Sequence, residues 1–343
     1  MNKKILCLGE ILLRFQAEKE LKFLQHPKFQ VYVGGSEANV AVALSQLNWK
    51  TALLSALPKN DLAEQALRYY HALSVGTDHI YRTGSRIATY FMEQGAAMRS
   101  SKIIYDRANA AINDLKLEEV DWEAAFEGVT NFHWSAITPA LSANAASLCS
   151  EAVKVAKEKK CHISADLHFR KNLWQFTDNI SEIVSPLIEA SHTVTGDPFT
   201  WQQLTGMQFG AEKLAAEAQP QDFEPIYRNI TRAFSTIDNL CMLVRKVHHA
   251  NHHELSGVML SRDQFEISKN QSVETIIDRV GGGDAFMAGV LYGLGSQKSV
   301  TETIDFATAI SALKHTIAGD AFIGTANDVE EVLNQSIPGK INR

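Results

Sequence analysis

Cysteine is scarce in this chain and is not placed to form a metal site or a disulfide framework. Its four cysteines, Cys7, Cys149, Cys161 and Cys241, stand far apart, and no C-x-x-C spacing occurs. Zinc modules and disulfide-stapled domains both depend on such spacings or on dense cysteine. We therefore expect buried, reduced thiols.

Long apolar runs and an excess of positive charge are also missing. Residues 5–8 form the only apolar run before Gly9, which is too short for a signal-peptide core or a membrane span. The formal net charge is −6 and the sequence pI is about 6.1, which argues against binding nucleic acid through phosphate contacts. We expect a cytoplasmic protein that binds neither membrane nor nucleic acid.

Short apolar runs alternate with segments of helical periodicity along most of the 343 residues, 45% of which are hydrophobic. We expect strands at residues 5–8, 51–57, 131–137, 162–166, 192–195 and 241–244. We expect helices at residues 38–47, 62–73, 143–159, 179–191, 223–235 and 300–317. The alternation predicts one α/β domain over residues 1–343, with a doubly wound, mostly parallel sheet flanked by helices. Ligands of such folds bind outside the carboxyl ends of the strands.

Two stretches depart from this alternation. Residues of about 12–33 and 86–106 alternate in the manner of half-buried antiparallel strands. From the pattern alone they are either ordinary surface hairpins or parts of a separate small sheet.

Residues 278–286 read Asp-Arg-Val-Gly-Gly-Gly-Asp-Ala-Phe and are the most informative segment. The glycines Gly281, Gly282 and Gly283 let backbone amides come close to a ligand. The apolar pattern after them predicts a helix, whose N-terminus attracts anions. Asp284 is then either a base that accepts the proton of an attacking hydroxyl or only the N-cap of the helix.

Other phosphate-binding signatures are missing from the chain. The dinucleotide fingerprint requires glycine where Phe286 stands, and the Walker sequence Gly-Lys-Ser/Thr does not occur. The catalytic loop of protein kinases is missing as well.

The segment D-x-V-G-G-G-D-A-F resembles the C-terminal signature of the ribokinase-like (PfkB) carbohydrate kinases. A second match is at residues 34–43, Gly-Gly-Ser-Glu-Ala-Asn-Val-Ala-Val-Ala, and the resemblance runs over essentially the whole chain. It implies an ATP-dependent sugar kinase with a ribokinase-like fold. It also implies that the two departing stretches form a β-sheet lid that closes over the sugar and pairs with a second subunit, in a homodimer or larger assembly.

Within this family the chain most resembles the 2-keto-3-deoxygluconate kinases (2-dehydro-3-deoxygluconokinases). Residues 166–174 match their D-x-N-x-R-x-x-L-W pattern, except that His168 replaces the Asn. Arg170 in this pattern and Arg107 in a Y-x-R pattern suit a substrate carboxylate, because guanidinium groups bind carboxylates with paired hydrogen bonds. The alternative for each arginine is an ordinary ion pair.

The resemblance implies a role for each remaining site residue. Tyr90 and Tyr105, in lid positions, contact the sugar or only pack the lid. The other residues expected to bind the sugar are Gly34, Gly35, Asn39 and Asp284. Those expected on the nucleotide side are Lys246, Gly281, Gly283 and His315, the last of which alternatively packs in its helix.

The implied reaction transfers the γ-phosphoryl group of ATP to the terminal hydroxyl of a 2-keto-3-deoxy sugar acid. Asp284 deprotonates that hydroxyl, and the amides of Gly281, Gly282 and Gly283 stabilise the transferring group. Mg²⁺ neutralises the nucleotide. The resemblance also allows backbone oxygens of residues 318–321 to bind a monovalent cation.

Three departures from the family pattern affect these expectations. An N-x-x-E element linked to Mg²⁺ is replaced by Asp197 and Thr200, so that no metal ligand is assigned. The T-L-R segment of the subgroup becomes residues 244–246, where Lys246 is the expected nucleotide-side cation. The histidines of residues 248–253 form either a metal site or a solvated loop or edge turn, and the missing four-ligand set favours the turn.

Three other functions compete with a sugar-acid kinase. A kinase for a neutral sugar such as fructose or ribose would leave Arg107 and Arg170 without a carboxylate. A catalytically weak sugar-acid sensor would fit the altered N-x-x-E and T-L-R segments. An NAD-dependent oxidoreductase would require the dinucleotide fingerprint that the chain lacks.

Overall fold

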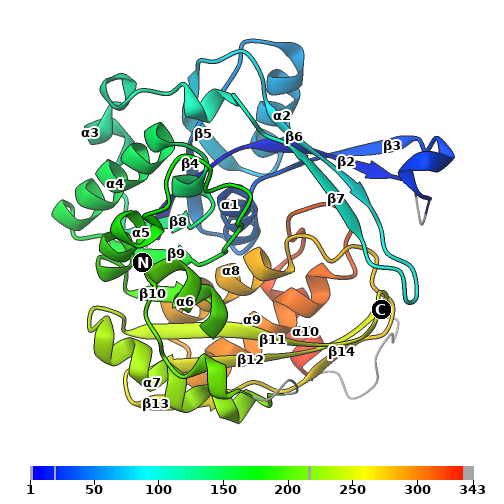
Figure 1. Ribbon diagram of the computed structural model, residues 1–343, viewed down its shortest axis with the longest axis vertical. Helices are drawn as coiled ribbons and strands as arrows, with labels where there is room; N and C mark the ends of the chain where they lie inside the picture. The colour runs from blue at the N-terminus through cyan, green and yellow to red at the C-terminus, as the bar shows by residue number, and fades with distance from the viewer. Residues whose placement is uncertain (1–2, 19–20, 215–217, 335–343) are drawn as a thin grey trace.

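The computed structural model describes residues 3–18, 21–214 and 218–334. A large sheet runs through the body of the molecule between two sets of helices, and a second, smaller sheet projects from one side (Figure 1). This arrangement confirms the expected α/β class and the separate small sheet.

The large sheet is parallel over most of its width. Its order is β13 (Gln264–Ile267), β12 (His252–Ser261), β11 (Asn239–His249), β10 (Thr193–Thr195), β9 (His162–Asp166), β8 (Asn131–Ser135), β1 (Lys4–Leu8), β4 (Lys50–Leu57) and β5 (Val75–Arg82), with β14 (Gln271–Val273) also on β12. The strands from β11 to β5 pair in parallel, whereas β12 pairs antiparallel with β11, β13 and β14. The central strands are apolar runs because helices cover both of their faces.

Of the ten α-helices in the described residues, seven begin and end close to the expected residues. The ten are α1 (Ser36–Gln46), α2 (Asp61–Ala72), α3 (Trp122–Ala125), α4 (Ala143–Glu158), α5 (Ile180–Glu189), α6 (Pro198–Thr205), α7 (Glu224–Ala233), α8 (Gly282–Gly295), α9 (Val300–Lys314) and α10 (Ala326–Asn334). Three of them, α3, α6 and α10, were not expected. Side-chain caps fix several starts: the oxygen of Ser142 accepts the Ala145 amide, and Ser299 forms a capping box with Glu302. No helix of the described residues is long and apolar enough to cross a bilayer.

One edge of the large sheet differs from the expectation. The strand expected at residues 241–244 is the inner part of β11, which continues to His249 through exposed, mostly polar residues. This extension was not expected, because its residues are exposed and its pairing with β12 stabilises it. The strand β12 was not expected either, although its residues 258–260 form a buried apolar run. All four cysteines are buried and unpaired, as expected.

The smaller sheet contains both of the stretches that departed from the alternation. Its order is β3 (Phe29–Gly34), β2 (Leu12–Ala17), β6 (Ala88–Glu93) and β7 (Lys102–Asp106). Only the outer pairs are antiparallel, since β2 and β6 run parallel, which corrects the expectation of antiparallel strands throughout. We call it the lid sheet.

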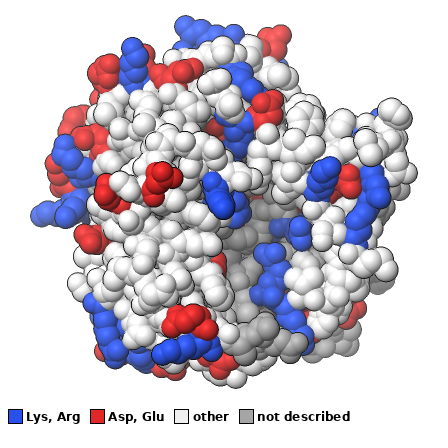
Figure 2. All heavy atoms as spheres, in the orientation of Figure 1, with Lys and Arg blue, Asp and Glu red and all other residues white. Residues whose placement is uncertain are grey.

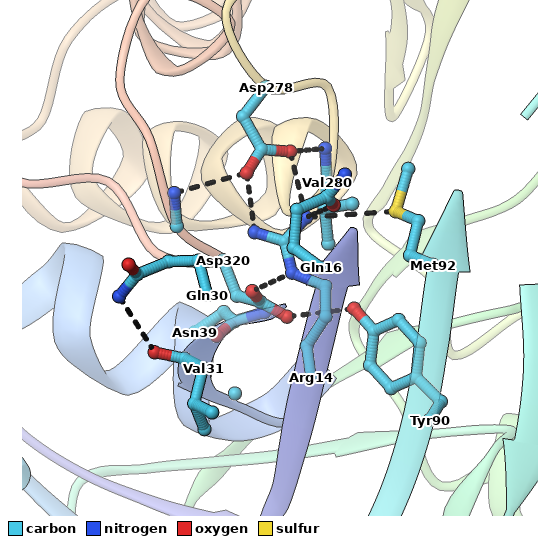
Figure 3. A network of polar contacts seen from close by, with 12 residues as sticks. Arg14, Gln16, Gln30, Val31, Asn39, Tyr90, Met92, Asp278, Val280 and Asp320 are labelled. Carbon is cyan, nitrogen blue, oxygen red and sulfur yellow. Dashed lines mark hydrogen bonds and ion pairs between the residues drawn. The ribbon is translucent and has the colours of Figure 1, made fainter. Parts of the chain in front are cut away.

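A buried guanidinium group joins the lid sheet to the body. Arg14 on β2 is fully buried, and its Nη1 donates to Oδ1 of Asp278 at 3.1 Å while its Nη2 also contacts that carboxylate. Its Nε lies 2.9 Å from Oδ1 of Asp320, whose Oδ2 accepts the hydroxyl of Tyr90 at 3.0 Å (Figure 3). Asp278 lies in the loop before α8, and Asp320 lies in the loop after α9. The side chain of Arg14 therefore holds three segments of the chain together.

We expect Arg14→Met to lower the free energy of unfolding by about 3–5 kcal/mol, because it leaves two buried carboxylates without their cation. Urea denaturation at neutral pH measures the loss. Arg228→Met is the matched control: its pair with Glu224 on α7 is partly exposed and should contribute less than about 1 kcal/mol. Equal losses in both variants would contradict the central role of Arg14.

Candidate functional site

A cavity of about 370 Å³ lies where the lid sheet faces the carboxyl ends of the central strands and the N-termini of α1 and α8. Figure 2 shows the surface hollowed at this place, with Lys and Arg side chains gathered along the hollow. Most of the expected site residues line it: Gly35, Asn39, Tyr90, Tyr105, Arg107, Arg170, Gly281, Gly282, Gly283 and Asp284. The two glycine segments, far apart in the sequence, therefore meet at one rim.

Two of the three glycines are required by close contacts. Gly281 has φ of 77°, and a Cβ there would stand 1.6 Å from the carbonyl oxygen of Asp320. A Cβ on Gly282 would stand 2.5 Å from Cε1 of His315. A Cβ on Gly283 would have one neighbour, Cε1 of His168 at 3.9 Å, and this residue borders the cavity. We call residues 281–283 the glycine rim. The first-turn amides of α8 have no partner within the helix, so this rim is suited to binding an anion.

Asp284 is a buried carboxylate held by the other glycine segment. It accepts hydrogen bonds from Oγ of Ser36 at 2.8 Å and from Nδ2 of Asn39 at 2.7 Å. Burial raises its pKa to about 7, although the nearby His168 opposes this rise. The N-cap of α8 is Gly281, so the alternative in which Asp284 only caps the helix is wrong. A carboxylate with this pKa suits proton transfer near neutral pH.

His168 connects Asp284 to a buried acid at the end of β9. Its Nε2 lies 2.9 Å from Oδ2 of Asp166, whose Oδ1 accepts the hydroxyl of Thr195 at 2.5 Å. Burial lowers the pKa of His168, but the charge and hydrogen bond of Asp166 outweigh this and raise it above the ordinary value. In the described part of the chain, Asp166, His168 and Asp284 are the one group of three whose ligand atoms lie close enough, within 4.8 Å, to hold a metal ion.

Four arginines line the cavity, and one of them is already neutralised. Arg107 forms an ion pair with the buried carboxylate of Glu10, its Nε and Nη2 both 2.6 Å from Oε2, as the alternative reading of this residue anticipated. Arg170, Arg245 and Arg279 form no ion pair with the residues that the structure describes. Three guanidinium groups are therefore available to anionic ligands.

Three expected residues do not line the cavity. Gly34 packs against Asp320, and Lys246 points to solvent beside Glu254. Successive side chains alternate along a strand, so Arg245 reaches the cavity and Lys246 does not. His315 is fully buried behind Gly282, where burial lowers its pKa to about 4, in agreement with the alternative that it packs in its helix.

The substituted family segments have structural partners of their own. Asp197 caps α6 by accepting the amides of Phe199 and Thr200, and the Thr200 hydroxyl donates to it. The histidine cluster lies around the hairpin that joins β11 and β12, as expected for an edge turn, and the ring of His248 stacks on that of His252. His253 alone departs from a solvated turn, because it is buried.

Sequence reasoning missed several residues of this site. Ser36 stands in the quoted glycine segment, and its hydroxyl type could have suggested a bond to an acid. Arg279 follows Asp278 directly in the C-terminal signature. Arg14 and Lys314 gave no local signal, because nothing near them in the sequence shows that these cations are buried.

Known proteins are similar to this chain over most of its length. The model of the pfkB family carbohydrate kinases matches residues 2–325. A 2-dehydro-3-deoxygalactonokinase of Haloferax volcanii is 28% identical over 336 residues, which cover 97% of each protein.

Two solved structures extend the comparison. The 2-dehydro-3-deoxygluconokinase of Thermotoga maritima is 32% identical, with a TM-score of 0.90 over 97% of this chain and 100% of that one. A PfkB family carbohydrate kinase of Listeria grayi is 27% identical, with a TM-score of 0.88 over 97% of this chain and 100% of that one.

We expect His168→Asn to raise the pKa of Asp284 further above about 7, because the variant removes the positive charge that opposes the effect of burial. Carboxyl ¹³C chemical shifts recorded against pH measure this value, and Asp284→Asn identifies the resonance. His162→Asn, at the opposite end of β9, is the control and should leave the titration unchanged. An unchanged titration in His168→Asn would show that the imidazole does not act on Asp284.

Proposed function

The chain belongs to the pfkB family of carbohydrate kinases, and we propose that it transfers the γ-phosphoryl group of ATP to the terminal hydroxyl of a 2-keto-3-deoxy sugar acid. The observation that carries this proposal is the position of Asp284. Its carboxylate lies in a cavity at the N-terminus of α8, which is also lined by the glycine rim and by three arginines that form no ion pair with the described residues.

In the proposed reaction, Asp284 takes the proton of the substrate hydroxyl while that oxygen forms a bond to the γ-phosphorus. The bond from phosphorus to the bridging oxygen breaks, and ADP leaves with its electron pair. The bonds from Ser36 and Asn39 orient the carboxylate, and the amides of Gly282 and Gly283 stabilise negative charge on the transferring group. His168, beside Gly283, adds positive charge at the same place.

Recognition of the sugar carboxylate is assigned mainly to Arg170. The Nη1 group of Arg170 donates to its neighbour's carbonyl, and the guanidinium lines the cavity without an ion pair among the described residues. Arg107 is a weaker candidate, because Glu10 already accepts from it. Tyr90 and Tyr105, on adjacent strands of the lid sheet, line the cavity from the other side.

Arg245 and Arg279 are the cations best placed for the phosphates of ATP, since both line the cavity beside the glycine rim. Mg²⁺ prefers oxygen ligands and is usually held by substrate phosphates together with one or two carboxylates. The group of Asp166, His168 and Asp284 includes an imidazole, and Asp166 already accepts two bonds, so it fits poorly as a dedicated magnesium site. Mg²⁺ would arrive with the nucleotide and supply charge neutralisation.

The lid sheet is proposed to close over the sugar and to pair with a second copy of the chain. Its face away from the cavity is apolar: Phe15 stacks on Phe91 with ring centroids 5.1 Å apart, and Phe29 and Ile104 are partly exposed beside them. An exposed apolar face of this kind is typical of an interface. We further propose that the protein acts in the cytoplasm.

We expect Asp284→Asn to lower kcat on the order of 10²–10⁴-fold, the usual contribution of a general base. The amide keeps the size of the side chain and can still accept one hydrogen bond. A coupled ADP-release assay measures the rate, and ATP binding by calorimetry shows whether the site remains intact. A rate close to that of the unaltered protein would exclude Asp284 as the base.

We expect 2-keto-3-deoxygluconate to be phosphorylated at least tenfold better, by kcat/KM, than fructose or ribose, because a site built to pair a carboxylate discriminates against substrates without one. Arg170→Met should remove most of this preference by raising KM for the sugar acid, and Arg262→Met, on an exposed turn, is the control. A preference for a neutral sugar would favour the alternative, a neutral-sugar kinase. The pairing of Arg107 with Glu10 supports this alternative, because it leaves that arginine less available to a substrate carboxylate. If none of these sugars supports ATP turnover, the result would favour a sensor.

A further inference from the structure

A fully buried ammonium group lies directly behind the glycine rim. Lys314, the last residue of α9, is 0% exposed. Its Nζ donates to the backbone carbonyl oxygen of Asp278 at 3.1 Å and to that of Ile317 at 3.0 Å. A charge is retained in a protein interior only where it is paired or hydrogen-bonded. The partners of this ammonium are backbone carbonyls, which is the kind of ligand that a bound cation receives.

The two carbonyls belong to the two loops that form the back of the site. Asp278 begins the segment that leads to Gly281, and Ile317 begins the loop that leads to Asp320. The carboxylate of Asp278 also accepts the amides of Val280 and Gly319, each from one of these loops. With the contact between Gly281 and Asp320, these bonds fix the backbone of the glycine rim from behind.

The loop of residues 318–321 was expected to offer backbone oxygens to a monovalent cation. In the structure, the side chain of Asp320 is occupied by Arg14 and Tyr90, and the carbonyls at the start of both loops turn toward Lys314. Two cationic side chains of the protein thus already lie between these loops, and the arrangement does not fit a further cation.

We propose that the ammonium of Lys314 is a built-in monovalent cation, which holds the glycine rim in its anion-binding shape and makes the protein independent of potassium or ammonium ions. Lys314 is a positioning residue, since it acts through the backbone of residues 278–281. Burial lowers the pKa of this group to about 8, with Asp278 and Asp320 opposing the shift, so the group still carries its charge at pH 7. The anion-binding role of the glycine rim rests on the proposed function, whereas the occupation of the cation position by the ammonium of Lys314 does not.

Lys314→Met tests the inference, because it keeps an apolar chain of similar length and leaves a space the size of an ammonium group beside the two carbonyls. Thermal unfolding without nucleotide is compared in potassium, ammonium and choline chloride at equal ionic strength. We expect the unaltered protein to unfold at one temperature in all three salts. The variant should unfold at a lower temperature in choline and recover in potassium or ammonium, because only these ions are small enough to enter.

Turnover supplies the second measurement. In choline the variant should lose kcat on the order of 100-fold, as expected when the rim is displaced by about 1 Å, with partial recovery in potassium or ammonium. Lys298→Met is the matched control: this ammonium pairs with the carboxylate of Glu330 at 2.7 Å, so its loss should not respond to the choice of cation.

Each outcome bears on one proposal. If the unaltered protein requires potassium for stability or turnover, or if the variant recovers equally in choline, the inference is wrong. If the variant fails to fold in every salt, the unaltered protein still tests the inference: a requirement for potassium or ammonium in its stability or turnover would contradict it. If the salt dependence of unfolding appears as expected but no sugar is phosphorylated, the cation inference stands and the proposed function falls.

Discussion

The buried guanidinium of Arg14 is the constraint on which the arrangement of the site depends. It faces Asp278 in the segment before α8 and Asp320 in the loop after α9, while its own strand belongs to the lid sheet (Figure 3). Removing a charge of this kind from water is costly unless every partner is in place. The folded chain therefore tolerates little freedom between the lid sheet at β2 and the two loops. An ordinary apolar contact would hold these parts together but would not fix their register.

The glycine rim lies beside these two loops, and packing accounts for two of its three glycines. A side chain at position 281 would clash with the carbonyl oxygen of Asp320. A side chain at position 282 would clash with the ring of His315. Only Gly283 has open space on the cavity side. A glycine triplet is usually interpreted as a place where a ligand needs room. Here two of the three glycines let the loops of the α8–α9 pair come close together, and only the third lies beside open space.

Local patterns were sufficient to predict the parallel part of the fold, whereas most of the cavity residues that were anticipated came from the family resemblance. Apolar runs and helical periodicity predicted the parallel part of the large sheet, and the glycine segments predicted the rim and Asp284. The extension of β11 consists of exposed residues and depends on its pairing with β12, which has no signature in a single sequence. The pairing of Arg107 with Glu10 and the burial of Arg14 and Lys314 depend on tertiary contacts. Sequence patterns identified which residue types could do chemistry, but not which charges would be neutralised by their neighbours.

The balance of charge in the cavity links the fold to its proposed chemistry. Glu10 is matched by Arg107 and Asp320 by Arg14, while Glu37 is buried with bonds from Ser135 and Thr138 that occupy its carboxylate. Against Asp284 there remain Arg170, Arg245 and Arg279 without ion pairs in the described part of the chain. The cavity is thus positive before any ligand enters, which favours ligands with several negative charges. Burial is the largest cause that raises the pKa of Asp284 to about 7, and the charge of Asp166 adds to it. A bound polyphosphate would raise the proton affinity of Asp284 further unless the arginines neutralised that phosphate. In the proposed reaction, the same three cations would therefore bind the phosphates and keep Asp284 able to accept a proton.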